Sequence, residues 1–182
     1  MVQMTFSDDI ESVARDIKNC KRCRLHEERT NTVPGIGSSD ADIMFIGEAP
    51  GKNEDEKGEP FVGRAGELLD RLLDSVGLSR EDVFIANVVK CRPPNNRNPR
   101  KDEIDACHPY LHRQIDLIKP KVICTLGNHA TDSILGKTGI SKIHGKRFEL
   151  DGYTVVPLYH PAAGLYNPNL VEDMKKDIEQ LK

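Results

Sequence analysis

The stretch DIMFIGEAPG, residues 42–51, decides the fold. Its first half, Asp42–Ile46, is a short apolar run that ends at Gly47, which is typical of a strand buried on both faces. Its second half, Gly47–Gly51, contains glycine and proline and opens a long loop that is also rich in acidic residues. A buried strand followed by such a loop favours an α/β domain with the loop at the carboxyl end of the strand.

Other apolar segments predict the remaining strands. Val83–Val89 and Val122–Leu126 are rich in β-branched residues. Asp151-Gly152 is a common hairpin pair and separates Phe148–Leu150 from Tyr153–Leu158. We therefore expect an α/β fold in which a mainly parallel, four-stranded central sheet lies between two layers of helices.

Helical spacing of apolar residues predicts the helices that cover this sheet. The predicted helices are Asp8–Lys18, Ala65–Val76, Asp102–Ile118, Asn128–Leu135 and Leu170–Leu181. Pro109 either kinks the third of these or begins a new helical segment. Thr30–Asp40 is rich in Thr, Asn, Gly and Ser and is predicted to be a loop. The length of 182 residues suits a single domain that spans residues 1–182.

Polar and glycine residues follow several of the predicted strands. Gly47–Gly51, Asn87, Gly127, Asn128 and His160 each fall at or just past the end of one. Open α/β sheets place their ligand crevice at the carboxyl ends of their strands. These distant segments are therefore predicted to converge on one pocket.

Composition excludes several classes of function. Lys and Arg number 26 against 29 Asp and Glu, so the net charge of −3 lacks the basic excess of many nucleic-acid binders. A polyanion would have to bind a local basic patch. The chain has no apolar run long enough to span a bilayer and no secretory leader, so we expect a monomeric cytoplasmic protein without a membrane partner.

Cysteine spacing predicts a metal centre. Cys20 and Cys23 form a C-x2-C pair, and Cys91 and Cys107 follow later in the chain. Four thiolates are enough for a tetrahedral zinc ion or a four-iron cluster, and spacing does not separate the two. Cys124 lies inside a predicted strand and is assigned to the core. The alternative is that the pair is a chance or redox pair and the other cysteines are core residues.

Four motifs together resemble one family. They are Gly47-Glu48-Ala49-Pro50-Gly51, Gly58-Glu59-Pro60-Phe61-Val62-Gly63-Arg64-Ala65-Gly66, Asn87-Val88-Val89-Lys90-Cys91-Arg92-Pro93-Pro94 and His160-Pro161. Between Cys20 and about Pro168 the chain resembles the family 4 uracil-DNA glycosylases, the iron-sulfur enzymes of thermophilic bacteria and archaea. The resemblance implies a uracil-DNA glycosylase fold and a [4Fe-4S] cluster on the four cysteines. It also implies release of uracil from single- and double-stranded DNA, which leaves an abasic site.

Three side chains suit the recognition of a flipped uracil. The Asn87 carboxamide carries both an acceptor for N3–H and a donor for O4, whereas cytosine presents the reversed pattern. Phe61 can stack on the ring, and His160 can donate to O2 as negative charge develops there. From the residues alone, Asn87 could instead bond a neighbouring loop, Phe61 could anchor that loop in the core, and His160 could be a cap.

The group that activates water has to be reassigned in this sequence. By the resemblance, Ala49 stands where better-known uracil glycosylases carry a water-orienting Asp, and Gly51 stands where they carry a shielding aromatic residue. Our hypothesis is that backbone groups of Gly47–Gly51 hold the water while Glu48 crowds the C5 edge of the base or assists electrostatically. Glu54 and Asp55 are alternative acids, or members of a solvated loop.

Two basic loops form a candidate phosphate track. The predicted DNA contacts are Lys90, Arg92, Arg97, Lys142, Lys146 and Arg147. Leu165 or Tyr166 would fill the gap that the flipped base leaves, unless both side chains cover the core. The other classes considered are a cysteine-stapled single-stranded nucleic-acid-binding module without catalysis, a redox protein, and a glycosylase with a broader base range.

Overall fold

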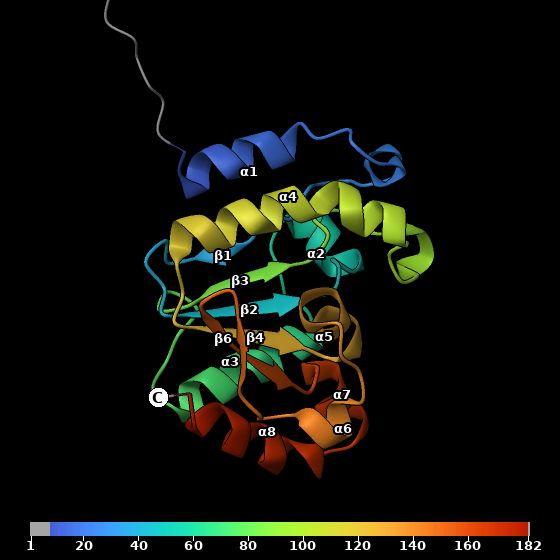
Figure 1. Cartoon of the computed structure of the whole chain (residues 1–182). Helices are drawn as coiled ribbons and strands as arrows, with labels where there is room; N and C mark the ends of the chain where they lie inside the picture. Colours follow the sequence, from blue (N-terminus) through green and yellow to red (C-terminus); the bar gives the residue numbers. More distant parts are fainter. Residues whose placement is uncertain (1–7, 182) are drawn as a thin grey trace, which may run out of the picture.

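The computed structural model describes residues 8–181, and in this range the strands form one six-stranded sheet in the order β1-β3-β2-β4-β6-β5 (Figure 1). The strands are β1 (Ile36–Gly37), β2 (Ile43–Gly47), β3 (Phe84–Asn87), β4 (Val122–Leu126), β5 (Phe148–Leu150) and β6 (Tyr153–Leu158). Strands β3, β2, β4 and β6 are parallel, and β1 and β5 pair antiparallel at the edges. The predicted parallel centre is confirmed. The prediction of a loop throughout Thr30–Asp40 is wrong, because β1 adds an edge strand there.

Alternation along β2 builds the two sides of the core. Ile43 and Phe45 point to one face of the sheet, and Met44 and Ile46 point to the other. All four side chains are buried. A strand covered on both faces explains why the sequence reads as a continuous apolar run.

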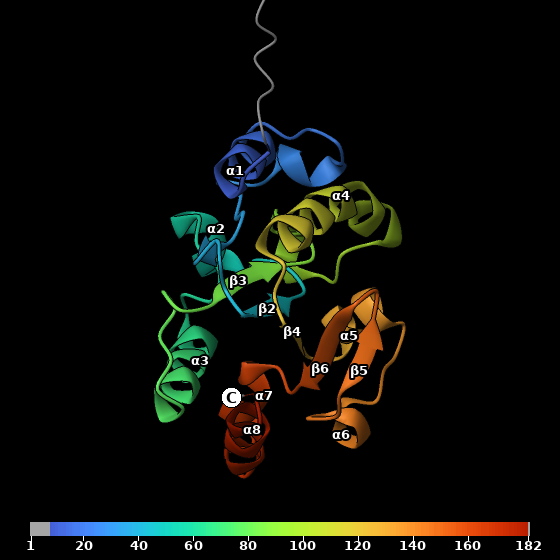
Figure 2. The ribbon, with the colours of Figure 1, turned by 60° about the vertical axis from the view of Figure 1, so that its left-hand side comes forward.

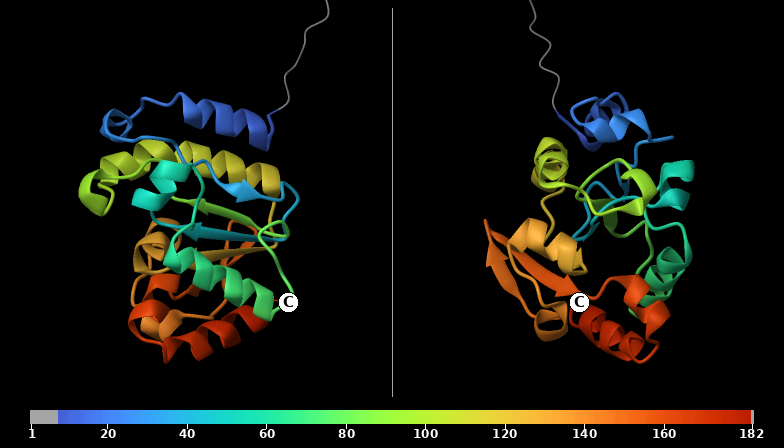
Figure 3. Two further views of the ribbon diagram at one scale, coloured as in Figure 1. Left: turned by 180° about the vertical axis from the view of Figure 1, so that it is seen from behind. Right: turned by 90° about the vertical axis from the view of Figure 1, so that its right-hand side faces the viewer.

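Helices cover both faces of the sheet. One face packs against α3 (Arg64–Ser75), α7 (Pro161–Tyr166) and α8 (Leu170–Glu179). The other face packs against α4 (Lys101–Ile118) and α5 (Asn128–Leu135), and Figure 2 shows the two groups on opposite sides of the sheet. Figures 1 and 3 show α1 (Ile10–Lys18) lying along α4, outside the sheet layers. Val13 and Ile17 bury this contact against Tyr110 of α4. The predicted α/β/α layers are present, with α1 added outside them.

Pro109 lies inside α4, which is one helix from Lys101 to Ile118. Proline lacks the N–H that would bond the carbonyl of Asp105, four residues earlier. Pro109 and Asp105 are both exposed, so water can satisfy that carbonyl. The alternative of a separate helical segment after Pro109 is therefore wrong.

Three short helices lie outside the segments that the sequence predicted to be helical. They are α2 (Lys52–Lys57), α6 (Ile140–Ile143) and α7, of which α7 begins with Pro161 directly after the cap residue His160. Two 3₁₀ turns, Arg24–Glu27 and Pro94–Asn96, complete the connections. Segments this short have little helical stability of their own and depend on tertiary contacts. No helix in the described part of the chain is long and apolar enough to cross a membrane.

Candidate active site and cysteine cluster

The carboxyl ends of the parallel strands meet at one edge of the sheet. Gly47 ends β2, Asn87 ends β3, and His160 follows β6 by two residues. A cleft of about 820 Å³ opens at this edge, and Asn87, Gly127, Asn128 and His160 line it together with Glu48 to Gly51. The predicted convergence of these segments is therefore present in the structure.

Gly47 lets two of the predicted recognition side chains approach each other. A Cβ atom on Gly47 would lie 2.6 Å from Asn87 Oδ1 and 2.8 Å from Phe61 Cζ. Any larger residue would push the carboxamide and the ring apart. The loop also pairs with the end of β3, because Val88 N donates to Gly47 O at 2.8 Å. Backbone pairing thus fixes the strand end that carries Asn87.

Phe61 lines the cleft from the connection between α2 and α3. Its side chain is buried, and its ring centroid lies 5.6 Å from that of His160, with the planes tilted by 34°. Its backbone φ is +50°, a left-handed value that residues other than glycine rarely adopt. The two rings therefore form adjoining walls of the cleft.

His160 is held in one tautomer by the first turn of α7. Its Nδ1 accepts a hydrogen bond from Ala162 N at 3.0 Å, so the proton of the neutral ring is on Nε2. Burial lowers the pKa of His160, while the nearby Glu54 carboxylate opposes this shift. The imidazole at this position is a neutral ring with one free N–H donor.

Glu48 lies at the mouth of the same cleft. Burial raises the pKa of its carboxyl group, and His129 opposes this shift. His129 Nδ1 lies 3.6 Å from Glu48 Oε2 at the start of α5. No sequence pattern singles out His129, because its approach to Glu48 depends on how α5 packs beside β2.

Glu54 and Asp55 hold loops in place. Glu54 accepts from Gly51 N at 3.0 Å and from Val62 N at 3.1 Å, which joins the loop after β2 to the residue after Phe61. Asp55 is buried and accepts from Thr30 N at 2.9 Å. The alternative of a freely solvated acidic loop is wrong for both carboxylates.

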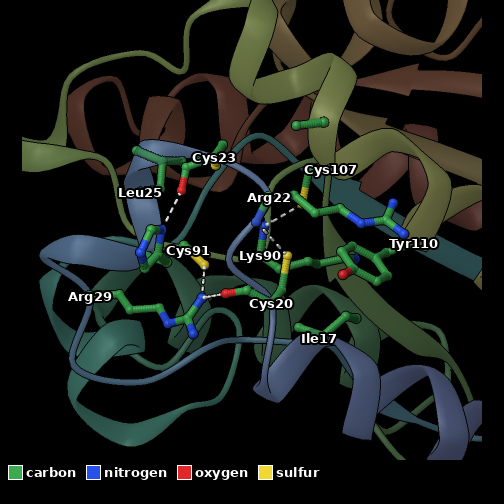
Figure 4. Close-up of a pocket in the computed structure, with 12 residues that line it drawn as sticks. Ile17, Cys20, Arg22, Cys23, Leu25, Arg29, Lys90, Cys91, Cys107 and Tyr110 are labelled. Carbon is green, nitrogen blue, oxygen red and sulfur yellow. Dashed lines mark hydrogen bonds between the residues drawn. The ribbon is translucent and has the colours of Figure 1, made fainter.

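The four predicted ligand cysteines line one cavity between the end of α1 with the segment that follows it, the loop after β3, and α4 (Figure 4). Three of the sulfurs accept N–H donors: Cys20 from Arg22 N at 3.4 Å, Cys91 from Arg29 Nη1 at 3.3 Å, and Cys107 from Lys90 N at 3.3 Å. Cys124 is buried in β4 and does not line this cavity.

Burial raises the pKa of the Cys107 thiol to about 11, and it also raises the pKa of Cys23 and Cys91. Buried thiolates need a compensating positive centre, so this donor set fits a metal group. The fit concerns the chemistry of the thiols that line the cavity, because among residues 8–181 no three His, Cys, Asp or Glu side chains are arranged to hold one metal ion together.

A buried ion-pair network supports the cysteine region. Arg97 donates to both carboxylate oxygens of Glu103, at 2.7 and 2.8 Å, and Arg24 Nε lies 3.7 Å from the same carboxylate. The Glu103 side chain is fully buried. This network joins the segment after Cys23 to the loop after β3 and to the first turn of α4.

The prediction that Lys90 contacts DNA is wrong. Lys90 is 1% exposed, and its Nζ donates to Asn87 O at 2.8 Å and to Gln114 Oε1 at 2.7 Å. The sequence pattern favours a surface position for a basic residue in a charged loop. In the structure the Lys90 side chain instead points into the protein, just after the end of β3. Lys90 therefore supports the residue that carries the carboxamide and does not reach the surface.

The other predicted DNA contacts have different surroundings. Arg97 lines the cleft but is paired with Glu103, and Arg92 donates to Asn96 Oδ1 at 2.7 Å. Lys142, Lys146 and Arg147 are exposed and lie outside the lining of the cleft. Leu165 packs against the core, whereas Tyr166 is 90% exposed and lines the cleft. Arg64, which the sequence analysis did not assign, also lines it.

Fold and site together define a class of protein. The chain belongs to the uracil-DNA glycosylase superfamily, whose family model matches residues 34–182. The solution NMR structure of a Methanosarcina acetivorans protein described as a candidate uracil DNA glycosylase has a TM-score of 0.54 at 15% identity. That match covers 84% of this chain and 98% of the other. At this identity the likeness concerns the fold alone.

Closer relatives place the chain in one branch of the superfamily. A protein of Sulfurisphaera tokodaii named type-4 uracil-DNA glycosylase is 51% identical over 96% of this chain and 84% of its own length. A Thermotoga maritima protein of the same name is 46% identical over 98% of this chain and 95% of its own length. The chain is thus a type-4 member of the family, which confirms the predicted resemblance.

Proposed function

We propose that the protein hydrolyses the N-glycosidic bond of deoxyuridine in DNA, which releases uracil and leaves an abasic site. The observation that carries this proposal is the meeting of Asn87, Phe61 and His160 around one cleft. A carboxamide, an aromatic ring and a neutral imidazole are the groups that a departing uracil anion needs for recognition, stacking and charge stabilisation.

Asn87 selects the base. Its Oδ1 accepts N3–H of uracil and its Nδ2 donates to O4. Cytosine presents an acceptor at N3 and a donor at N4, so both groups of the carboxamide would lose their partners. The side chain is 2% exposed, which makes an unpaired polar group costly and the discrimination strong. Lys90, through its bond to Asn87 O, stabilises the strand end that presents this side chain.

His160 stabilises the leaving base. Cleavage of the bond moves an electron pair onto uracil and leaves an oxocarbenium-like sugar. Because His160 Nδ1 accepts from Ala162 N, Nε2–H is the donor that faces uracil O2. The water then attacks the sugar C1′, and the proton that it loses neutralises the uracil anion, so that free uracil and an abasic sugar result. We propose that backbone groups of Gly47–Gly51 hold this water and that Glu48 assists electrostatically.

Cys20, Cys23, Cys91 and Cys107 would hold a [4Fe-4S] cluster. The choice of iron follows the resemblance to family 4 enzymes, and the four thiols that line one cavity support a shared metal centre. When bound, the cluster supplies a crosslink between α1, the loop after β3 and α4. The N–H donors from Arg22, Arg29 and Lys90 would stabilise the negative charge of the sulfurs.

DNA would bind across the cleft with the target base rotated out of the stack. Rotating the base costs a few kcal/mol, less for a mispaired or single-stranded uracil. Tyr166 is exposed at the end of α7 and would fill the gap in the duplex. Arg64 and Arg92 would contact phosphates near the cleft, and Lys142, Lys146 and Arg147 would form a second, more distant patch.

One experiment tests the proposed function. The purified protein is incubated with single- and double-stranded oligonucleotides that carry one uracil, and alkali then breaks any abasic site. Cleavage at the uracil alone, with free uracil in the supernatant, is the expected result. Intact oligonucleotide that is nevertheless bound would favour a nucleic-acid-binding module without catalysis. Matched oligonucleotides with thymine or cytosine at the same position serve as controls.

A further inference from the structure

The backbone around Phe61 is held in an unfavourable conformation. Phe61 has φ of +50°, although a bulky side chain favours negative φ. The residue lies in a segment without regular structure between α2 and α3, residues 60–63. A strained conformation persists when neighbouring groups hold it, and such groups are therefore part of what orients the ring.

Arg80 is the residue that holds this backbone. It lies between α3 and β3, and its guanidinium donates to Pro60 O at 2.9 Å, to Phe61 O, and to Gly66 O at 3.3 Å. Its Nε also donates to the Asp70 carboxylate. The planar guanidinium thus joins the carbonyls of Pro60 and Phe61 to the first turn of α3. A lysine ammonium cannot bond the same three carbonyls with this geometry.

Gly66 makes this arrangement possible. A Cβ atom on Gly66 would overlap the Phe61 carbonyl oxygen, and it would lie 3.1 Å from Arg80 Nη2. The first turn of α3 can therefore approach the Phe61 backbone only with glycine at this position. Arg80, Gly66 and the Phe61 carbonyl therefore form one compact contact.

We propose that Arg80 is a positioning residue for base recognition, which fixes the Phe61 ring in the orientation that stacks on uracil, with Asp70 orienting the Arg80 guanidinium in turn. This inference rests on the proposed function. Arg80 and Asp70 are absent from the lining of the cleft, so they act on the base through Phe61. The Asp70 side chain is 46% exposed, so its substitution leaves the core unchanged.

A double-mutant cycle tests this role. The four proteins are the wild type, Arg80→Met, Phe61→Ala and the double variant, each measured by uracil binding in calorimetry and by single-turnover uracil release. Because a small displacement of a binding group is costly, Arg80→Met should weaken uracil binding and slow release by about 10- to 100-fold. In the Phe61→Ala background, Arg80→Met should cause less than about a 2-fold change.

The control separates positioning from general loss of stability. Arg113 of α4 joins Asp8, which precedes α1, and Asp16 of α1 in a comparable network, and none of the three lines the cleft. Arg113→Met should lower the melting temperature without changing uracil binding. If Arg80→Met does not fold, Arg80→Lys and Asp70→Asn carry the same cycle, with smaller losses expected.

Two outcomes would overturn the inference. One is a loss in Arg80→Met that is as large in the Phe61→Ala background as in the wild type, because Arg80 would then act independently of the ring. The other is unchanged uracil binding in all three variants of Arg80 and Asp70. Failure of the wild-type protein to release uracil would contradict the proposed function instead, so the two failures are distinguishable.

Discussion

His160 Nδ1 accepts a hydrogen bond from the backbone N–H of Ala162, 3.0 Å away, inside the first turn of α7. Protonation of Nδ1 would place its N–H directly opposite the N–H of Ala162, so that two donors would face each other. The bond therefore opposes formation of the imidazolium, in the same direction as burial, which lowers the pKa of this ring. The first turn of α7 thus keeps the His160 imidazole neutral, with Nε2–H as the donor that a glycosylase needs for its leaving base.

This relationship predicts an acid limb in the pH profile. Single-turnover uracil release should be level above about pH 6.5, the ordinary pKa of histidine, and should fall below the lowered pKa of His160 as the imidazolium forms. His160→Gln should be slower at all pH values but should lack this limb. If the limb persists in His160→Gln and disappears in Glu48→Gln, the titrating group is Glu48 instead.

Asn87→Asp should abolish most of the activity. The substitution replaces the donor to uracil O4 by a second, negatively charged acceptor, so kcat/KM for uracil release should fall by at least about 100-fold. Asn169→Asp, at an exposed position beside α8, makes the same chemical change outside the cleft and should leave kcat/KM unaltered. A loss of less than 10-fold in Asn87→Asp would argue against recognition of the base by this carboxamide.

Cysteine substitutions should separate the cluster ligands from the core cysteine. Cys107→Ser should remove the visible absorbance of an iron-sulfur centre and most of the bound iron. The variant keeps only three of the four thiolates that a [4Fe-4S] cluster requires. Cys124→Ser places a hydroxyl in a fully buried strand and should lower stability while the iron content is unchanged. Iron analysis and absorbance spectra of the two variants check this difference. Equal iron content in both would exclude Cys107 as a ligand.

Glu103 should contribute strongly to stability near neutral pH. Its bonds to Arg97 hold the pKa of the carboxyl group at about 2 in place of 4.5. The contribution is therefore complete above about pH 4.5 and is lost as the pH falls through about 2. Because Glu103→Gln breaks a buried ion pair, it should cost about 3 kcal/mol of unfolding free energy at pH 7.

Urea unfolding of wild type and Glu103→Gln at several pH values checks this prediction. The difference between the two proteins should shrink when the pH is lowered from 6 toward 3. Glu56→Gln is an exposed carboxylate control and should match the wild type throughout. A difference that stays constant with pH would show that packing, and not the ionised carboxylate, accounts for the loss.

Tyr166→Ala should affect duplex DNA more than single strands. The side chain would fill the gap left by the flipped base, a role that single-stranded substrate does not require. Uracil release from a duplex should fall by about 10-fold, with less than about a 2-fold change on single strands. Ile36→Ala removes another exposed apolar side chain, at the β1 edge, and should change neither rate. Equal losses on both substrates would contradict this role.

Much of the site could be predicted because it depends on local patterns. The run from Asp42 to Gly47 has the composition of a strand buried on both faces, and strand ends in a parallel sheet meet at one edge. Asn87 and His160 could thus be placed together before the structure was known. The positions of the cysteines also identified the four that line one cavity and left Cys124 for the core.

The surroundings of individual side chains could not be predicted in the same way. Lys90 begins a basic stretch of the sequence, yet its Nζ is buried against Gln114, which is 24 positions away. Arg80 has no distinctive motif, and its contact with Phe61 spans 19 positions. Charge patterns show that a cation is present, but its partner depends on how separate segments pack.

The sequence by itself determined the central strands and the longer helices, the edge of the sheet at which the cleft opens, and the set of cysteines that meet. These follow from apolar periodicity and spacing, which consecutive residues carry. The tertiary structure alone decided that Lys90 is buried, that Glu54 and Asp55 bind backbone amides, that His160 is a neutral Nε2–H donor, and that Arg80 fixes Phe61. Burial and hydrogen-bond partners arise from contacts between segments distant in the chain, and the free energy of a polar side chain depends on those contacts.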